Sequence, residues 1–195
     1  SVSLAVLFGA FLLYANDYYR ASDDVATIIS DYDGVIAQEG SYTIVYPLSE
    51  NNKDVGLVFY PGGKVEAQAY MPLLIQLADE GITSVLVKMP FNLAVFNINA
   101  ANKAVALVEE VDTWYLSGHS LGGAMASSYM NKNTSKFDGL ILLAAYPINE
   151  ADIPTLQMYG SNDLVLDQQK IVESVPFYEV VGGNHAYFGN YGEQA

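Results

Sequence analysis

The feature that most constrains this chain is the pentapeptide Gly118-His119-Ser120-Leu121-Gly122, which has the form G-x-S-x-G. A short apolar run at 113–117 precedes it, and a helix-like run at 121–132 follows it. A serine on a sharp turn between a strand and a helix has its hydroxyl exposed above the end of a sheet. The glycines permit that turn because side chains there would collide with neighbouring backbone. The pentapeptide therefore predicts a strand-turn-helix unit that carries a reactive serine.

Short apolar runs alternate with helix-like runs along most of the chain. A hairpin about Gly40-Ser41 is expected to join strands at 35–39 and 42–46, and further strands are expected at 55–60, 83–88, 113–117, 139–144, 155–159 and 177–181. Helices are expected at 66–80, 98–111, 121–132 and 167–174. The polar, acidic stretch 21–34 resembles a linker. This order is typical of an α/β fold with a mostly parallel, doubly wound sheet, in which ligands bind beyond the carboxyl ends of the strands.

Composition excludes several kinds of function. The 195 residues suit one domain, and 51% hydrophobic content is enough for a substantial core. The net charge of −14 offers no basic surface, so nucleic-acid binding is not expected. The chain has no cysteine, which excludes disulfides, thiolate catalysis and cysteine-based zinc sites. We expect no metal and no cofactor.

The reactive serine needs a general base, because its hydroxyl is a weak nucleophile at neutral pH. The chain has two histidines. His119 adjoins the serine on the tight turn and points away from it, so it is expected to pack beneath the turn. His185 ends the segment Gly182-Gly183-Asn184-His185 just after the last strand, where a loop can return its side chain to Ser120. His185 is therefore the candidate base.

The histidine in turn needs an acid that fixes its tautomer and stabilises its protonated form. Asp163 follows the strand at 155–159 and is the candidate. Its rivals are Asp167, which is expected to cap the next helix, and Asp152 and Glu150, which precede the strand at the wrong edge of the sheet. The order serine, aspartate, histidine is that of the α/β-hydrolase fold. The interval between Asp163 and His185 is too short for a large lid.

An oxyanion hole requires two N–H donors. One is expected from the backbone of Leu121, directly after the serine. The other is expected from Pro61-Gly62-Gly63-Lys64, the loop after the strand at 55–60. Gly63 is the preferred donor and Lys64 the alternative.

Phe91 and Asn92 belong to the loop after another strand, at 83–88. They are candidates for lining the cleft, and a buried connection is the equally weighted alternative.

The N-terminal residues 2–15 are apolar and uncharged. They are fewer than the roughly 20 residues that a full membrane span needs, and the chain begins at Ser1 rather than Met. A trimmed membrane anchor or signal segment is expected at 1–20, with Tyr14, Tyr18 and Tyr19 suited to a membrane interface. The alternative is a buried N-terminal helix. We therefore expect a membrane-anchored or extracytoplasmic location, with a cytoplasmic one as alternative, and a catalytic domain at 21–195.

These motifs together resemble the α/β-hydrolase superfamily, and within it small, lidless bacterial members of the fold-5 type. The matching segments lie at 59–66, 87–94, 118–123, 160–163 and 183–185, within a resemblance that covers roughly 40–190. Many relatives have His-Gly at the oxyanion strand, where this chain has Pro61-Gly62. Relatives of this type are carboxylic-ester hydrolases, often with an N-terminal membrane segment.

The expected function is hydrolysis of a carboxylic ester or a related acyl compound through Ser120, His185 and Asp163, with a small molecule as the substrate. A lactone, thioester or peptide bond is an alternative with the same three residues. A non-catalytic, membrane-anchored binding protein that retains the fold is another. The sequence does not indicate an oligomeric state.

Overall fold

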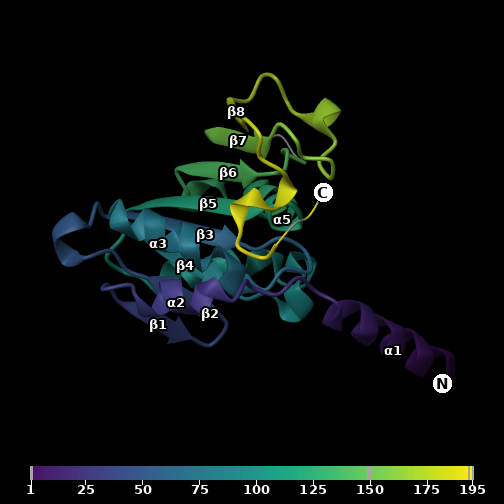
Figure 1. Cartoon of the computed structure of the whole chain (residues 1–195). Helices are drawn as coiled ribbons and strands as arrows, with labels where there is room; N and C mark the ends of the chain where they lie inside the picture. Colours follow the sequence, from purple (N-terminus) through teal and green to yellow (C-terminus); the bar gives the residue numbers. More distant parts are fainter. Residues whose placement is uncertain (1, 149–150, 193, 195) are drawn as a thin grey trace.

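The computed structural model describes residues 2–148, 151–192 and 194 of the chain, and its centre is one eight-stranded sheet (Figure 1). In spatial order the strands are β1 (Ile36–Glu39), β2 (Tyr42–Val45), β4 (Ile82–Val87), β3 (Val55–Tyr60), β5 (Thr113–His119), β6 (Gly139–Leu143), β7 (Thr155–Gly160) and β8 (Phe177–Val180). β1 pairs with β2 and β2 pairs with β4 in antiparallel fashion, and the other neighbours pair in parallel. The expected mostly parallel sheet is confirmed.

Helices cover both faces of the sheet, and alternation along each strand divides the core into two layers. Val58 and Tyr60 of β3 pack on the face that carries α4 (Ala101–Ala106) and α5 (Leu121–Met130). Leu57 and Phe59 pack on the opposite face, beneath α2 (Asp24–Ser30) and α3 (Met71–Asp79). A strand buried on both faces reads as a continuous apolar run, which is why the bounds of β3 match its expected range.

Several helical segments differ from expectation. The expected linker at 21–34 contains α2, because Val25, Ile28 and Ile29 have helical spacing and pack against the α3 layer. The range 66–80 divides into a 3-10 turn and α3, with Pro72 in the first turn of that helix. The range 98–111 is helical only through Ala106, because the chain must then turn into β5.

The expected helix at 167–174 is wrong, because only a 3-10 turn at Gln168–Lys170 forms there. The buried Gln157 side chain of β7 donates to the carbonyl of Val172 at 2.9 Å and accepts from the Val172 N–H at 3.3 Å. The second bond takes the Val172 N–H, which a helix would have directed to the carbonyl of Gln168. The described connections from β6 to β8 therefore hold no helical lid.

The N-terminal helix α1 (Val2–Asn16) projects away from the sheet near the carboxyl ends of the strands (Figure 1). The segment after it is tied to the loop that follows β3. Tyr19 N–H donates to the carbonyl of Lys64 at 2.7 Å, and Glu66 N–H donates to the carbonyl of Tyr19 at 2.8 Å. Within the described residues, no helix is both long enough and apolar enough to cross a membrane.

Candidate active site

Ser120 occupies the turn between β5 and α5. Its backbone has φ 51° and ψ −119°, a conformation that residues with side chains rarely adopt. A Cβ on Gly122 would collide with the carbonyl of Tyr60, and one on Gly118 would collide with the backbone of Gly122. Both outer glycines are therefore needed for β3, β5 and α5 to meet this closely. The turn leaves Ser120 partly exposed at the carboxyl edge of the sheet.

Asp163 and His185 form a buried pair beside this edge. The Asp163 Oδ2 atom lies 2.8 Å from Nδ1 of His185, and both side chains are almost completely shielded from solvent. The Oδ1 atom of Asp163 accepts the N–H groups of Val165 at 2.9 Å and Leu166 at 2.8 Å. With the carboxylate held on both oxygens, Nδ1 of His185 is the protonated nitrogen and Nε2 keeps a free lone pair.

The loops that carry the pair are joined by backbone contacts. Ser161 N–H donates to the carbonyl of Val180 at 3.0 Å, and Asn162 N–H donates to the carbonyl of Gly183 at 2.8 Å. Gly160 approaches the Gly183 carbonyl so closely that a Cβ would overlap it. The ends of β7 and β8 thereby fix Asp163 relative to His185.

Ser120 and His185 line the same open depression, which has a volume of about 440 Å³. Within the described part of the chain, no direct hydrogen bond joins the Ser120 hydroxyl to the His185 ring. Such contacts are often long in unliganded hydrolases and shorten when substrate binds. The structure thus brings the three predicted residues to one site, with the Asp163–His185 contact already formed.

His119 lies beneath the turn, as expected, but it also carries a polar network that the sequence does not reveal. Its Nε2 lies 2.9 Å from the carbonyl of His185, and its Nδ1 lies 2.8 Å from the hydroxyl of Tyr70. A carbonyl only accepts, so Nε2 carries the proton and Nδ1 accepts from Tyr70. The Tyr70 oxygen in turn accepts the Gly62 N–H at 3.0 Å. His119 therefore links the loop after β3 to the loop that holds His185.

Stability is expected to depend on pH through His119. Its complete burial, followed by the nearby His185, lowers the pKa of His119 from its ordinary value of 6.5 to about 3. Between these two values the unfolded chain binds a proton that the folded chain excludes. The contribution of neutral His119 to the free energy of unfolding is therefore fully present above pH 6.5. It is lost as the pH falls toward 3, by about 1.4 kcal/mol per pH unit.

Urea unfolding at pH 7, 6 and 5 measures this dependence. The His119→Phe variant is the control, since it removes the titrating group while keeping an aromatic ring. We expect the variant to be less stable at pH 7 but to lose less stability on acidification than the wild type. Equal pH slopes for the two proteins would contradict this assignment.

The two preferred oxyanion donors lie next to one another. A Cβ on Gly63 would lie 2.8 Å from Cδ2 of Leu121, so the loop after β3 adjoins the first turn of α5. Leu121 is the first residue of that helix, where backbone N–H groups have no partner within the helix. Within the described part of the chain, neither the Leu121 nor the Gly63 N–H has a hydrogen-bond partner, and an oxyanion hole requires two such donors.

Lys64 is unsuited to its alternative role as oxyanion donor. Its N–H donates to the carbonyl of Asn92 at 2.8 Å. Its ammonium group lies 3.2 Å from the Asp17 carboxylate and 4.3 Å from the ring centroid of Tyr14. Lys64 thus connects the loop after β3 to the loop after β4 and to the end of α1.

Phe91 and Asn92 both have positive φ, 55° and 54°. Phe91 is 47% exposed and contacts Phe11 of α1 and Phe96, with ring centroids 5.1 and 5.7 Å apart. Neither Phe91 nor Asn92 is among the described residues that line the depression beside Ser120. They therefore form part of the junction with α1.

The rival acids differ in position from Asp163. Asp167 lines the depression, but its carboxylate accepts the Gln169 N–H at 3.2 Å and caps the short turn. Asp152 precedes β7, as the sequence indicates, and Glu150 lies outside the described residues. Among the described residues, no group of three or more histidine or acidic side chains has the geometry to hold a metal ion.

Comparison with known proteins supports the resemblance. A model of the family described as "Alpha/beta hydrolase family" matches residues 56–195. The crystal structure of TT1662 from Thermus thermophilus is similar with a TM-score of 0.62 and 13% sequence identity, over 78% of this chain and 90% of that chain. At this identity the similarity establishes the fold alone. No curated protein matches the sequence significantly. The expected division of the chain at residue 20 stays a prediction.

Proposed function

Because the chain belongs to the alpha/beta hydrolase family, we propose that it is a serine hydrolase that cleaves carboxylic esters. The observation that carries this proposal is the buried Asp163–His185 pair, 2.8 Å between Oδ2 and Nδ1, of which His185 lines the same depression as Ser120. A carboxylate that fixes the histidine tautomer leaves the other ring nitrogen free to act as a base toward a serine hydroxyl.

In the proposed reaction, Ser120 Oγ attacks the ester carbonyl carbon while Nε2 of His185 takes the hydroxyl proton. The Leu121 and Gly63 N–H groups stabilise the negative oxygen of the tetrahedral intermediate. The bond to the alcohol then breaks, and the alcohol leaves with the proton from His185. Water repeats these steps on the acyl-enzyme and releases the carboxylic acid. Asp163 remains ionised throughout and stabilises the protonated His185.

The bond class is tested with matched acyl groups. We would measure kcat/KM for a butyryl ester, a butyryl thioester, a five-membered lactone and a butyryl-capped peptide. The proposal predicts the largest kcat/KM for the ester, with a pre-steady-state burst of about one alcohol per protein. If kcat/KM were larger for the thioester, the lactone or the peptide, that bond would replace the carboxylic ester as the proposed substrate. No turnover by folded protein would favour a binding protein that retains the fold.

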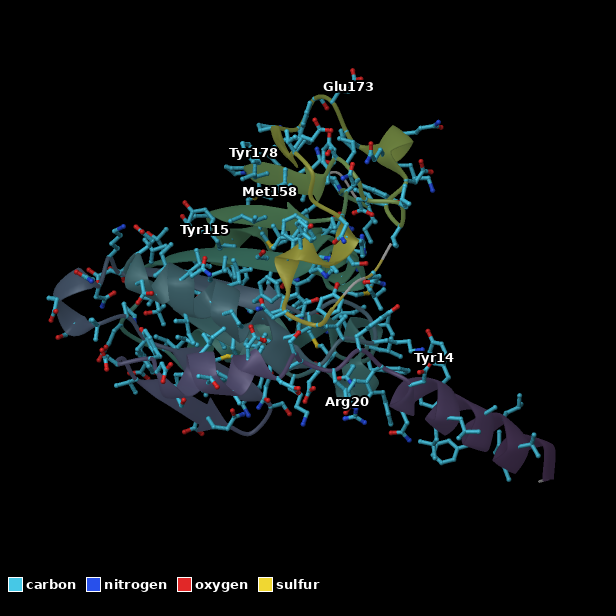
Figure 2. The ribbon with its side chains drawn as sticks, in the orientation of Figure 1. Tyr14, Arg20, Tyr115, Met158, Glu173 and Tyr178 are labelled. Atoms are coloured by element: carbon cyan, nitrogen blue, oxygen red, sulfur yellow. The ribbon has the colours of Figure 1, made fainter. Side chains whose placement is uncertain are left out.

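We also propose that α1 associates with a lipid surface. The side chains of Leu4, Leu7 and Leu13 are 74%, 67% and 76% exposed, and side chains project from α1 on several sides (Figure 2). A helix that is apolar all round suits a lipid environment better than a protein groove, which would cover one side only. Tyr14 and Arg20 lie where α1 meets the domain, and such aromatic and basic residues favour the level of the lipid headgroups (Figure 2).

Flotation with phosphatidylcholine vesicles tests this association. A zwitterionic lipid is appropriate because a net charge of −14 is repelled by an anionic surface. We expect the wild type to float with the vesicles and the double variant Leu4→Lys/Leu7→Lys to remain unbound. Val35→Lys places a charge at an equally exposed apolar residue away from α1 and should leave flotation unchanged. Equal flotation of wild type and double variant would rule out insertion of α1.

A further inference from the structure

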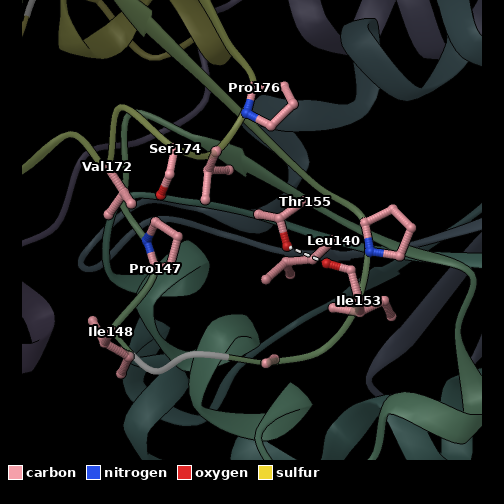
Figure 3. A pocket seen from close by; sticks show the side chains of 11 residues that line it. Leu140, Pro147, Ile148, Ile153, Thr155, Val172, Ser174 and Pro176 are labelled. Atoms are coloured by element: carbon pink, nitrogen blue, oxygen red, sulfur yellow. Dashed lines mark hydrogen bonds between the residues drawn. The ribbon is translucent and has the colours of Figure 1, made fainter.

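We propose that a second depression, next to the one at Ser120, holds the acyl chain of the substrate, which makes this protein a hydrolase of medium- to long-chain acyl esters. The inference rests on the proposed ester hydrolysis and specifies its substrate class. The second depression has a volume of about 640 Å³, within the range of about 300–1,000 Å³ typical of ligand sites. Figure 3 shows the side chains that surround it.

The depression lies between the two connections that follow β6 and β7. One wall comes from residues 147–148 and 151–154, and the other from 172 and 174–176, while Leu140 and Thr155 of the sheet lie between them (Figure 3). The described residues of the two connections form no α-helix against the sheet, and the second connection holds only the 3-10 turn Gln168–Lys170. Most of the lining side chains are apolar: Leu140, Pro147, Ile148, Ile153, Val172 and Val175.

Ile148 connects this depression to the site of chemistry. It lines both the depression that contains Ser120 and the larger one beyond it. Its N–H donates to the buried Ser127 hydroxyl of α5 at 3.0 Å, which holds the residue beside that helix. An acyl chain that leaves the carbonyl carbon at Ser120 can therefore pass Ile148 and continue into apolar surroundings.

The walls of the larger depression are held in place without a ligand. Gln157 binds the backbone of Val172 through both ends of its amide and also donates to the carbonyl of Val175 at 3.3 Å. On the other wall, the Thr155 hydroxyl donates to the carbonyl of Ile153 at 3.1 Å (Figure 3). A preformed apolar site favours binding because little ordering is needed when the chain enters.

The position of His185 indicates that the larger depression binds the acyl chain of the ester rather than its alcohol group. The leaving alcohol must receive its proton from His185. The His185 ring packs beside His119, at 4.8 Å between centroids, and His119 in turn contacts Phe188 and Tyr70 on the α3 side of the sheet. The larger depression lies on the opposite, α5 side, with Leu140 in that core layer. The alcohol and the acyl chain therefore leave the reacting carbon on different sides.

The test compares kcat/KM for p-nitrophenyl acetate and p-nitrophenyl decanoate. We expect the wild type to prefer the decanoate by at least tenfold. Ala151→Trp and Ser174→Trp are designed to fill the larger depression from its two opposite walls. Because Ser174 is exposed, we expect Ser174→Trp to leave folding intact. Each variant should lower kcat/KM for the decanoate at least tenfold and leave the acetate within twofold. Ala106→Trp, at an exposed residue of α4, should change neither.

Three results would overturn the inference while leaving ester hydrolysis intact. The wild type could hydrolyse both esters equally well, both filling variants could keep the decanoate preference, or the preference could follow the alcohol arm when decyl acetate is compared with ethyl acetate. Failure of the proposed function looks different. A folded wild type that hydrolyses none of these esters would overturn ester hydrolysis, and the acyl-chain site with it.

Discussion

Replacing Ser120 by alanine is expected to lower kcat for ester hydrolysis by a factor on the order of 10⁴ or more. Ser120 Oγ is the proposed nucleophile, so its removal eliminates the acyl-enzyme route and leaves only the oxyanion donors and substrate binding. The backbone at Ser120 has φ 51°, which alanine tolerates about as well as serine does, so the fold should be retained. The measurement is kcat on p-nitrophenyl butyrate, with urea unfolding of the same samples.

Ser128→Ala is the matched control, since Ser128 is a partly exposed serine on the same helix, α5, and does not line the depression. It should change kcat by less than twofold. A Ser120→Ala protein that retained more than about 1% of the wild-type kcat would exclude Ser120 as the nucleophile.

Replacing Asp163 by asparagine is expected to lower kcat by about 10³–10⁴. An asparagine can place its oxygen where Oδ1 accepts the N–H groups of Val165 and Leu166. Its amide nitrogen then faces Nδ1 of His185 as a donor. Nδ1 must accept that bond, so the ring proton moves to Nε2 and the base toward Ser120 is lost. The variant thus tests the tautomer while leaving the loop almost unchanged.

Asp167→Asn separates the two candidate acids. The carboxylate of Asp167 caps the turn after it, through the Gln169 N–H, rather than holding the ring of His185. We expect this variant to reduce kcat by less than tenfold. If Asp167→Asn were instead the more damaging change, Asp167 would be the acid and the role assigned to Asp163 would be wrong.

The sheet and the order of the site residues can be predicted from the sequence because both depend on short-range patterns. The continuous apolar run of β3 indicates a strand buried on two faces, and the observed strand has the same bounds as the expected one, 55–60. The carboxyl ends of β5, β7 and β8 then place Ser120, Asp163 and His185 at one edge of the sheet. No side-chain geometry is needed for that step.

Features that depend on distant contacts could not be predicted in this way. The stretch 167–174 has a helix-like pattern, but the buried amide of Gln157 takes the backbone groups of Val172. The link from Gly62 through Tyr70 and His119 to His185 joins residues far apart in sequence. Neither the residues around His119 nor those around Tyr70, which precedes α3, have a sequence pattern that indicates this contact.

Covalent labelling with a fluorophosphonate probe, followed by mass spectrometry of the labelled peptide, tests most directly whether Ser120 is an activated nucleophile. The probe reacts with a serine only where a neighbouring base activates the hydroxyl. We expect one label per chain, on Ser120, in the wild type and none in Ser120→Ala or His185→Ala. A folded wild type that stays unlabelled, or carries its label on another residue, would contradict the assignment of Ser120 as an activated nucleophile.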